Sequence, residues 1–331
     1  MAALPSTSTS VPAMRNYKLR TDLQRAVIGS FALPLGIEPL NLPAPTQGYT
    51  LEFHEGEDGE PDCWSFHVVA SHDRMVGLVR EAFGLLPDEV TPIVEVGSRD
   101  AYRSMDVYIA QRPVPFEDFL DTWEAFEPVI LEDASVGVGA NAEDPFVEVF
   151  LDSWKGLLIH VPEDMKDRVE RMLRRHSLRE VEETWPEDLD EAGPPSQVRE
   201  VLQIDDDQSP DLDEVLLQLR ERWALEIDVD PETNVDEGGR DLGNTLWYGI
   251  ALCRDASGEG GGAYVTLWAT AGSVAEVERL AACRLEADGR WAFQSFYTLD
   301  RVAFDERPEE LADLPMRGRM PVVHLVFEEP W

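Results

Sequence analysis

The chain has 331 residues, 43% of them hydrophobic, and its 66 acidic residues outweigh 28 basic ones to give a formal net charge of −38. This length fits one large or two ordinary domains, and no stretch approaches the ~20 consecutive apolar residues of a membrane helix. Such charge disfavours binding to nucleic acid or to an anionic membrane, because phosphate neutralisation needs a positive surface. It suits a basic partner, although an acidic bias of the whole proteome would leave the same composition.

The first residues are small and rich in Ser, Thr and Pro, and no basic region precedes a long apolar core. They predict a disordered tail at 1–16 rather than a secretory signal. The three cysteines, Cys63, Cys253 and Cys283, are far apart and form no CxxC pair. This usage predicts reduced thiols and a cytoplasmic protein.

Thr21 and Gln24 have capping-box spacing, which predicts a helix at about 22–32. The runs 49–54 and 63–70 alternate between apolar and polar residues across a turn-rich connector, so they predict a hairpin. Ser71 is then placed to cap a helix that carries apolar residues at helical spacing.

The same order of elements recurs twice. Strands are predicted at 91–96 and 104–111, before a helix bracketed by Pro115 and Pro128, and a further pair at 146–153 and 156–162 precedes a helix at 163–178. Residues 182–214 hold thirteen acids and one base, so they contain the best linker candidate, at 182–210.

After the linker, Ser209-Pro210 predicts the start of another helix. Residues 245–255 and 263–271 predict a second hairpin, and Ser273 with Glu276 predicts a capped helix after it. Asp288-Gly289 between strand-like runs predicts a third hairpin, and the chain ends in a strand near 321–329.

Paired strands followed by helices favour an α+β fold, with mainly antiparallel sheets and helices packed on one face. The predicted organisation is two domains, 17–181 with three strand–strand–helix units and 211–331. A doubly wound parallel sheet is the rival, but it needs strict alternation of strands and helices.

The acidic stretch 226–239 resembles a calcium loop in its spacing, with ligand types at Asp228, Asp230 and Glu232. Thr233 takes the position that needs glycine, and Gly239 the one that needs glutamate. An ordinary acidic loop is therefore the better prediction, and these three residues are the candidate metal ligands that remain.

Gly137, Gly139 and Ala142 have the spacing of a dinucleotide-binding fingerprint. Pro145 and a strand-like run follow them instead of a helix, so the segment is predicted to be a flexible connector. No GxSxG, HExxH or GxxxxGK[ST] motif occurs in the sequence. No catalytic residue and no cofactor are predicted.

Two other groups are candidates for binding. Acidic linker residues and outward-facing tyrosines are predicted to contact a protein partner, namely Asp205, Asp206, Asp207, Asp211, Tyr248 and Tyr297. A basic cluster on the third helix is a candidate for phosphate binding, through Arg168, Arg171 and Arg175. Pairing with the acid-rich segment that follows the helix, or a position beside its buried stripe, explains these arginines better.

The leading hypothesis is an acidic, non-catalytic interaction or inhibitory protein that engages a basic partner, in the manner of an immunity protein or a nucleic-acid mimic. One alternative is a hydrolase whose carboxylate or metal site is dispersed through the fold. The other is an assembly subunit whose hairpin edges pair between copies.

Overall fold

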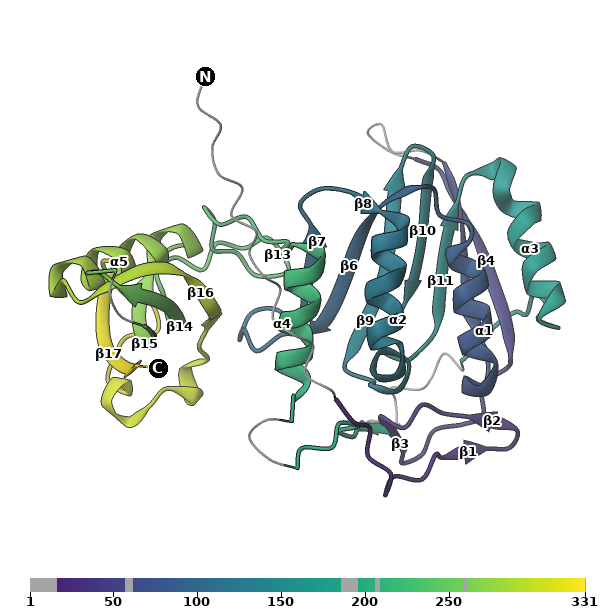
Figure 1. Cartoon of the computed structure of the whole chain (residues 1–331), viewed down its shortest axis with the longest axis horizontal. Coiled ribbons are helices and arrows are strands. Elements are labelled where there is room, and N and C mark those ends of the chain that lie inside the picture. Colours follow the sequence, from purple (N-terminus) through teal and green to yellow (C-terminus); the bar gives the residue numbers. More distant parts are fainter. Residues whose placement is uncertain (1–16, 57–61, 186–195, 206–208, 259–260, 331) are drawn as a thin grey trace. The chain divides into compact units, whose positions relative to one another are not determined.

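In the computed structural model the chain forms two compact units, one of residues 1–96 and 107–228 and the other of 97–106 and 229–331. The structure describes residues 17–56, 62–185, 196–205, 209–258 and 261–330 (Figure 1). The tail predicted at 1–16 lies outside the described residues. The helix predicted after the linker belongs to the first of these units.

The first unit is built on a nine-stranded antiparallel sheet. Eight strands follow the order β13-β7-β6-β9-β10-β11-β5-β4, and the short β8 pairs with β6. Their bounds are β4 (Gly48–His54), β5 (Cys63–Val69), β6 (Glu89–Gly97), β7 (Met105–Ala110), β8 (Val114–Pro115), β9 (Val136–Glu143), β10 (Phe146–Leu151), β11 (Leu157–Val161) and β13 (Leu225–Ile227). The predicted hairpin of β4 and β5 is confirmed by their pairing.

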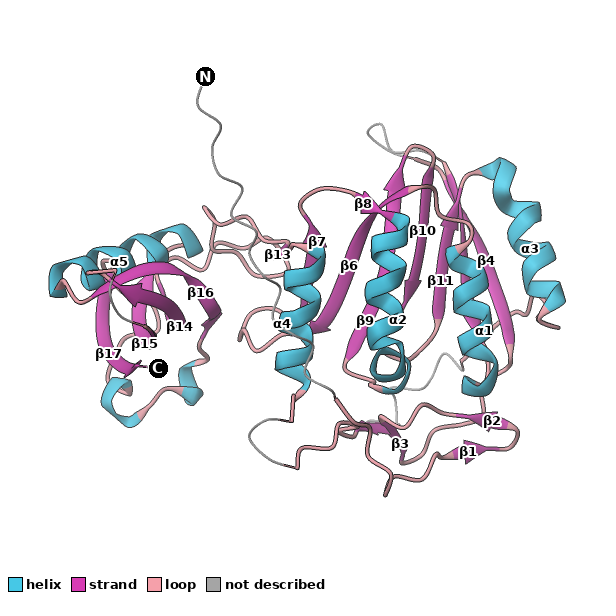
Figure 2. Ribbon diagram, in the orientation of Figure 1, coloured by secondary structure: helices cyan, strands magenta, loops and turns pink. Residues whose placement is uncertain are grey.

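The helices of this unit pack against one face of the sheet (Figure 2). They are α1 (His72–Phe83), α2 (Phe116–Glu132), α3 (Lys166–Arg175, after the 3-10 turn η1, Glu163–Met165) and α4 (Leu212–Trp223). Each buries an apolar stripe in a core that alternate strand residues such as Phe66, Val138 and Ile159 complete. Because neighbouring side chains on a strand point to opposite faces, the remaining residues point away from the helices.

Short strands stand beside this sheet: β1 (Val27–Ile28) with β2 (Phe31–Ala32), and β3 (Ile37–Pro39) with β12 (Ser196–Val198). The helix predicted at 22–32 is therefore wrong. Gly29, at φ +63°, turns the chain between β1 and β2, and Phe31 is buried in a small separate cluster. The predicted linker is also partly integrated, because Val201 and Leu202 are buried in the main core.

The second unit is a four-stranded antiparallel sheet in the order β16-β14-β15-β17. The strands are β14 (Thr245–Asp255), β15 (Gly262–Ala271), β16 (Trp291–Arg301) and β17 (Val322–Pro330), and α5 (Val274–Asp288) packs on one face. The β14–β15 hairpin is confirmed. Two 3-10 turns, η2 (Phe304–Glu306) and η3 (Glu309–Leu311), lie between β16 and β17.

Three further predictions are corrected. Asp288-Gly289 makes no hairpin, because Gly289 at φ +68° ends α5 as its left-handed cap. The segment predicted as a flexible connector is strand β9, and α2 runs through Pro128 to Glu132. A proline in a helix costs one backbone hydrogen bond, and burial of the flanking Phe126, Val129 and Ile130 offsets that loss.

Candidate functional site: the acidic face of the large sheet

Polar side chains form a continuous row across the face of the nine-stranded sheet that points away from its helices. The pairing register joins neighbouring strands through Thr91, Asn141, Glu148, His160, Ser65 and Glu52, in that order. Directly opposed residues in adjacent strands lie ~4.5–5.5 Å apart at Cβ, close enough to interact. The row therefore brings together residues separated by up to about a hundred positions in the chain.

This face carries negative charge only. At the described outward positions of its strands there is no Lys or Arg, while carboxylates recur from one edge to the other. We call it the acidic face, defined by Glu52, Glu95, Glu143, Glu148, Asp152 and Glu226. Several basic residues of this unit stand instead on the helices, such as Arg80 and Arg174.

The carboxylates at the centre of the acidic face are held in an unfavourable environment. Burial raises the pKa of Glu95, and the nearby charges of Glu148 and Asp152 raise it further. Burial also raises the pKa of Glu148, against a hydrogen bond from Asn141, and the pKa of Asp152, against a hydrogen bond from the Gly156 amide and the positive charge of Lys155. Each group thus resists ionisation, and a cation brought to this face would relieve that cost.

Two histidines accompany these carboxylates. Burial lowers the pKa of His160, whose Nδ1 lies 2.7 Å from Ser65 Oγ and whose Nε2 lies 3.7 Å from Glu148 Oε1. His67 Nε2 lies 3.9 Å from Asp152 Oδ2. Serine, histidine and glutamate in this order resemble a nucleophile with its base. The strand amides beside them are committed to the sheet ladder, so the described backbone offers no pair of donors for an oxyanion.

Glycines shape the floor of the acidic face. Phe150 is almost fully buried there because its ring lies over Gly137 and Gly139 on the neighbouring strand β9. A Cβ on Gly137 would stand 2.8 Å from the Phe150 ring, and one on Gly139 would collide with the backbone of Val149 and Phe150. The spacing that resembles a nucleotide fingerprint therefore serves close packing within a sheet.

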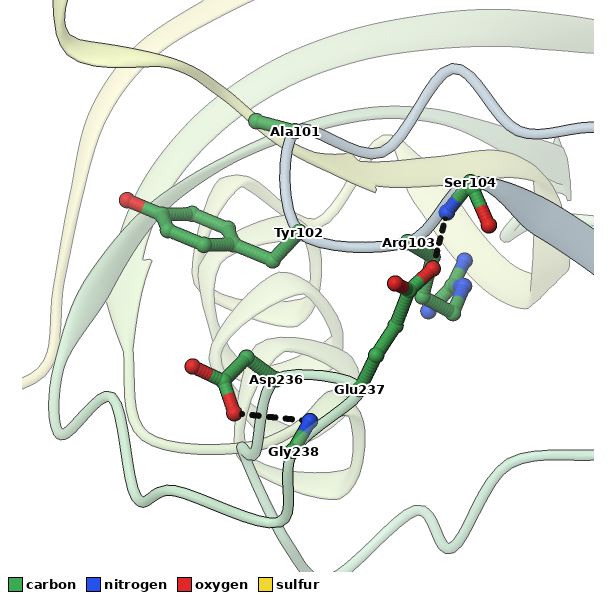
Figure 3. Close-up of a pocket in the computed structure, with 7 residues that line it drawn as sticks. All are labelled: Ala101, Tyr102, Arg103, Ser104, Asp236, Glu237 and Gly238. Carbon is green, nitrogen blue, oxygen red and sulfur yellow. Dashed lines mark hydrogen bonds between the residues drawn. The ribbon is translucent and has the colours of Figure 1, made fainter. Parts of the chain in front are cut away.

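The second unit contains an open pocket of about 470 Å³, lined by Ala101, Tyr102, Arg103, Ser104, Asp236, Glu237 and Gly238 (Figure 3). Its charged groups are engaged within the unit. Glu237 Oε1 accepts from the Ser104 amide at 2.5 Å, Asp236 accepts from the Gly238 amide, and Arg103 donates to Asp106 at 2.9 Å. The charged groups that line the pocket therefore already have hydrogen-bond partners within the protein.

Behind this pocket lies a buried ionic network. Arg301 is 4% exposed and donates to both carboxylate oxygens of Asp100, which is 3% exposed, and to Asn234. Burial, together with the charges of Asp106 and Asp100, raises the pKa of Asp300 to about 6. Arginine therefore neutralises the buried carboxylates of this unit, in contrast to those of the acidic face.

The acidic loop 226–239 is organised by its own side chains. Asp230 Oδ1 accepts from the Glu232 amide, and Asp236 Oδ1 accepts from the amides of Gly238 and Arg240. Such turns use carboxylates as local acceptors. Asp228, Asp230 and Glu232 remain predicted metal ligands only, and within the described ranges no group of three or more His, Cys, Asp or Glu residues converges to hold a metal ion.

The predicted partner residues fall into different places. Asp211 is the N-cap of α4 and accepts from the Glu214 amide at 2.9 Å, and Asp205 forms an exposed pair with Lys18. Asp206 and Asp207 lie outside the described residues. Tyr248 and Tyr297 lie on the face of the four-stranded sheet that points away from α5. The sheet therefore groups the two tyrosines, and the described acids belong to the other unit.

Of the predicted phosphate-binding arginines, two have partners inside the fold. Arg168 donates to the Gly84 carbonyl at 2.6 Å, and Arg175 pairs with Glu81. Arg171 is exposed on the same helix. These two contacts therefore tie α3 to α1, whereas the sequence predicted pairing with the acid-rich segment after α3.

Sequence reasoning missed a buried charge cluster in the first unit. Burial alone would raise the pKa of Glu132, but hydrogen bonds from His72 and Arg25 lower it to about 2. Burial lowers the pKa of Lys155 to about 8, and its Nζ donates to the Val136 carbonyl at 2.6 Å. A signal was available, because Lys155 is one of only three lysines in the chain.

No family model, no curated protein and no solved structure matches this chain. Among the described helices, none is both long and apolar enough to cross a membrane. The functional argument therefore depends on the geometry and charge of the chain itself.

Proposed function

We propose that this chain is a non-catalytic interaction protein that binds a basic protein partner on the acidic face. The observation that carries the proposal is the charge of that face: carboxylates recur across its strands, and its described outward positions hold no Lys or Arg. A lysine or arginine side chain placed between Glu95 and Glu148 would meet two carboxylates whose pKa values are already raised. Binding then gains both attraction and relief of repulsion.

The arrangement of this face favours a protein partner over a small molecule. Small ligands usually bind in concave pockets of roughly 300–1,000 Å³, and this face is a sheet whose side chains stand in rows. Partly buried carboxylates are also the positions at which an arriving cation is desolvated, where charge pairs contribute most to specificity. We place the interaction in the cytoplasm, a proposal that the reduced state of Cys63, Cys253 and Cys283 supports, since none of them forms a disulfide.

The test is affinity capture from the native cell with the full chain as bait, repeated at rising salt. The variant Glu95→Gln/Glu148→Gln removes two charges from the acidic face, and Glu117→Gln/Glu124→Gln removes two exposed charges from helix α2. We expect a basic protein in the wild-type and α2-variant captures, with at least about tenfold less in the acidic-face variant. Equal capture by both variants would contradict the proposal.

A carboxylate-dependent hydrolase is the second candidate. The raised pKa values of Glu95 and Glu148 favour it, because a general acid must hold its proton near neutral pH. A panel of chromogenic glycosides and esters tests this function. Turnover by the wild-type chain that is abolished by Glu148→Gln would replace the binding proposal. Absence of turnover with every compound of the panel would exclude the hydrolase.

A further inference from the structure

The four-stranded sheet of the second unit has one face without a helix, and that face is apolar. Helix α5 lies over the other face (Figure 2), where residues such as Trp247, Val265 and Leu267 form the core. The opposite positions of the strands carry Tyr248, Ile250, Leu252, Tyr264, Trp268, Tyr297, Leu325 and Phe327. We call this set the apolar face.

Large side chains on the apolar face reach solvent. Phe327 is 56% exposed and Tyr264 is 41% exposed. Their neighbours form ring contacts within the face, with Tyr248 and Trp268 at 4.8 Å between centroids and Tyr264 and Tyr297 at 6.0 Å. A contiguous aromatic surface of this kind marks an interaction site, whereas single exposed apolar residues do not.

Charge is confined to the margins of the apolar face. Arg254 and Glu329, the latter opposite Tyr264, stand at one end of the strands, and Asp300, opposite Tyr248, stands at the other. The outward positions between them are uncharged and include Thr266 and Thr298. The segment 302–321 closes the end near Thr270, where Gly318 approaches that side chain and donates its amide to the Asn244 carbonyl. The chain has a net charge of −38, but this face is largely uncharged. The surface that complements it best is therefore another uncharged, apolar surface.

The extent of the face fits a dimer. Four strands of 9 to 11 residues, spaced by ~4.8 Å with ~3.3 Å per residue, give a face of roughly 600 Å² in projection when its charged margins are included. Two such faces bury on the order of 1,000 Å², the lower limit for a specific interface. A two-fold axis needs only one kind of surface on each chain and gives the commonest oligomer, and two twisted sheets pack face to face ~10 Å apart.

We propose that a second copy of this chain covers the apolar face, so that two four-stranded sheets form a sandwich. Tyr264 lies on the interior strand β15 and Phe327 on the edge strand β17, and both lose their exposure to solvent in the contact. The proposed function concerns the other unit, so the dimer can form or fail independently of it. The dimer contact uses the face of a sheet, whereas the predicted assembly subunit would pair strands at the sheet edges.

Sedimentation velocity of the full chain tests the dimer across the micromolar range. We expect the wild-type chain to sediment with an apparent mass of twice the chain mass of 37.2 kDa. The dimer dissociation constant of Phe327→Asp should be at least about tenfold higher. The matched control is Phe304→Asp, which changes an aromatic residue of similar exposure, 51%, outside the face. It should leave the dimer unchanged.

Salt separates this contact from an electrostatic one. Raising the salt concentration screens repulsion between two strongly acidic chains, so the dimer should persist or tighten. A wild-type chain that stays monomeric overturns the inference, as does equal weakening by Phe327→Asp and Phe304→Asp. Far-ultraviolet circular dichroism of both variants shows whether each is folded. If Phe327→Asp is unfolded, Tyr264→Ser takes its place, with the same outcomes.

Discussion

The nine-stranded and four-stranded sheets are both antiparallel, and each has helices on one face, but their other faces differ in chemistry. The acidic face presents Glu95, Glu148 and Asp152, whereas the apolar face presents Trp268 and Phe327. Alternation along a strand commits one set of residues to the core and leaves the other set open to selection for another purpose. Function must therefore be argued from the outward set, because the fold class does not determine it.

The two units also neutralise their carboxylates differently. In the second unit the buried Asp100 and Asp106 are held by Arg301 and Arg103. On the acidic face the carboxylates face one another, and burial raises the pKa of the central ones. A unit that supplies its own cations is electrostatically complete, whereas a surface without them is suited to a partner that brings them.

The largest effect is expected when the second unit loses its internal cation. Arg301→Met leaves the buried Asp100 with the longer 3.7 Å contact to Arg103 Nη1 in place of its main ion pair, and breaking a buried ion pair in this way costs about 3–5 kcal/mol. Hydrogen exchange across a urea series should show β14 and β16 opening at lower denaturant. Arg240→Met removes an exposed pair with Asp236 and should cost at most about 1 kcal/mol. Equal losses would show that Arg301 does not sustain the unit.

The next effect concerns the glycines under the acidic face. Gly139→Ala drives a Cβ into the backbone of strand β10 and should destabilise the first unit by about 3 kcal/mol, whereas the Cβ of Gly137→Ala meets chiefly the Phe150 ring. Phe150→Ala should therefore relieve Gly137→Ala but not Gly139→Ala in double-mutant cycles measured by urea unfolding. Equal relief of Gly137→Ala and Gly139→Ala would show that the Phe150 ring alone causes both collisions.

Sequence patterns specified what is local. The β4–β5 and β14–β15 hairpins follow from alternation, and the capping box predicted the start of α5, where Ser273 Oγ accepts from the Glu276 amide. Asp288-Gly289 misled because a left-handed glycine serves a hairpin turn and a helix end equally well. The helix predicted at 22–32 does not form, because Gly29 adopts a left-handed turn within that segment. The capping-box spacing alone did not reveal this turn.

The acidic face lay beyond sequence reasoning for a different reason. Glu95, Glu148 and His160 each stand in a strand whose alternation was visible, so their outward orientation was predictable in principle. Which strands are neighbours is a long-range property, since β6 pairs with β9 and β5 with β11. The convergence of these residues appears only once the strand order is known.

Acid should act on the two units in opposite directions. The pKa of Asp300 is raised to about 6, so its folded state keeps a proton that the unfolded state has lost, and stability falls as pH rises from about 4 to 6. Asp300→Asn removes that cost and should stabilise the second unit by about 2 kcal/mol at pH 7.5, with no gain below about pH 4. The pKa of Glu132 is lowered to about 2, so the first unit loses stability as pH falls from about 4.5 to 2. Unfolding curves at several pH values measure both effects. A gain from Asp300→Asn that persists in acid would exclude this cause.

The smallest effect is a difference in salt response between the two faces. A synthetic oligo-arginine peptide should bind the full chain and lose about tenfold in affinity between about 0.05 M and 0.5 M NaCl, because salt screens exposed charges beyond a few ångströms. Its affinity should fall with Glu95→Gln/Glu148→Gln and remain unchanged with Phe327→Asp. Calorimetric titration of these chains separates the two surfaces. If Phe327→Asp lowered the affinity for the peptide as much as the acidic-face variant does, peptide binding would depend on the dimer. The two faces would then not be independent binding surfaces.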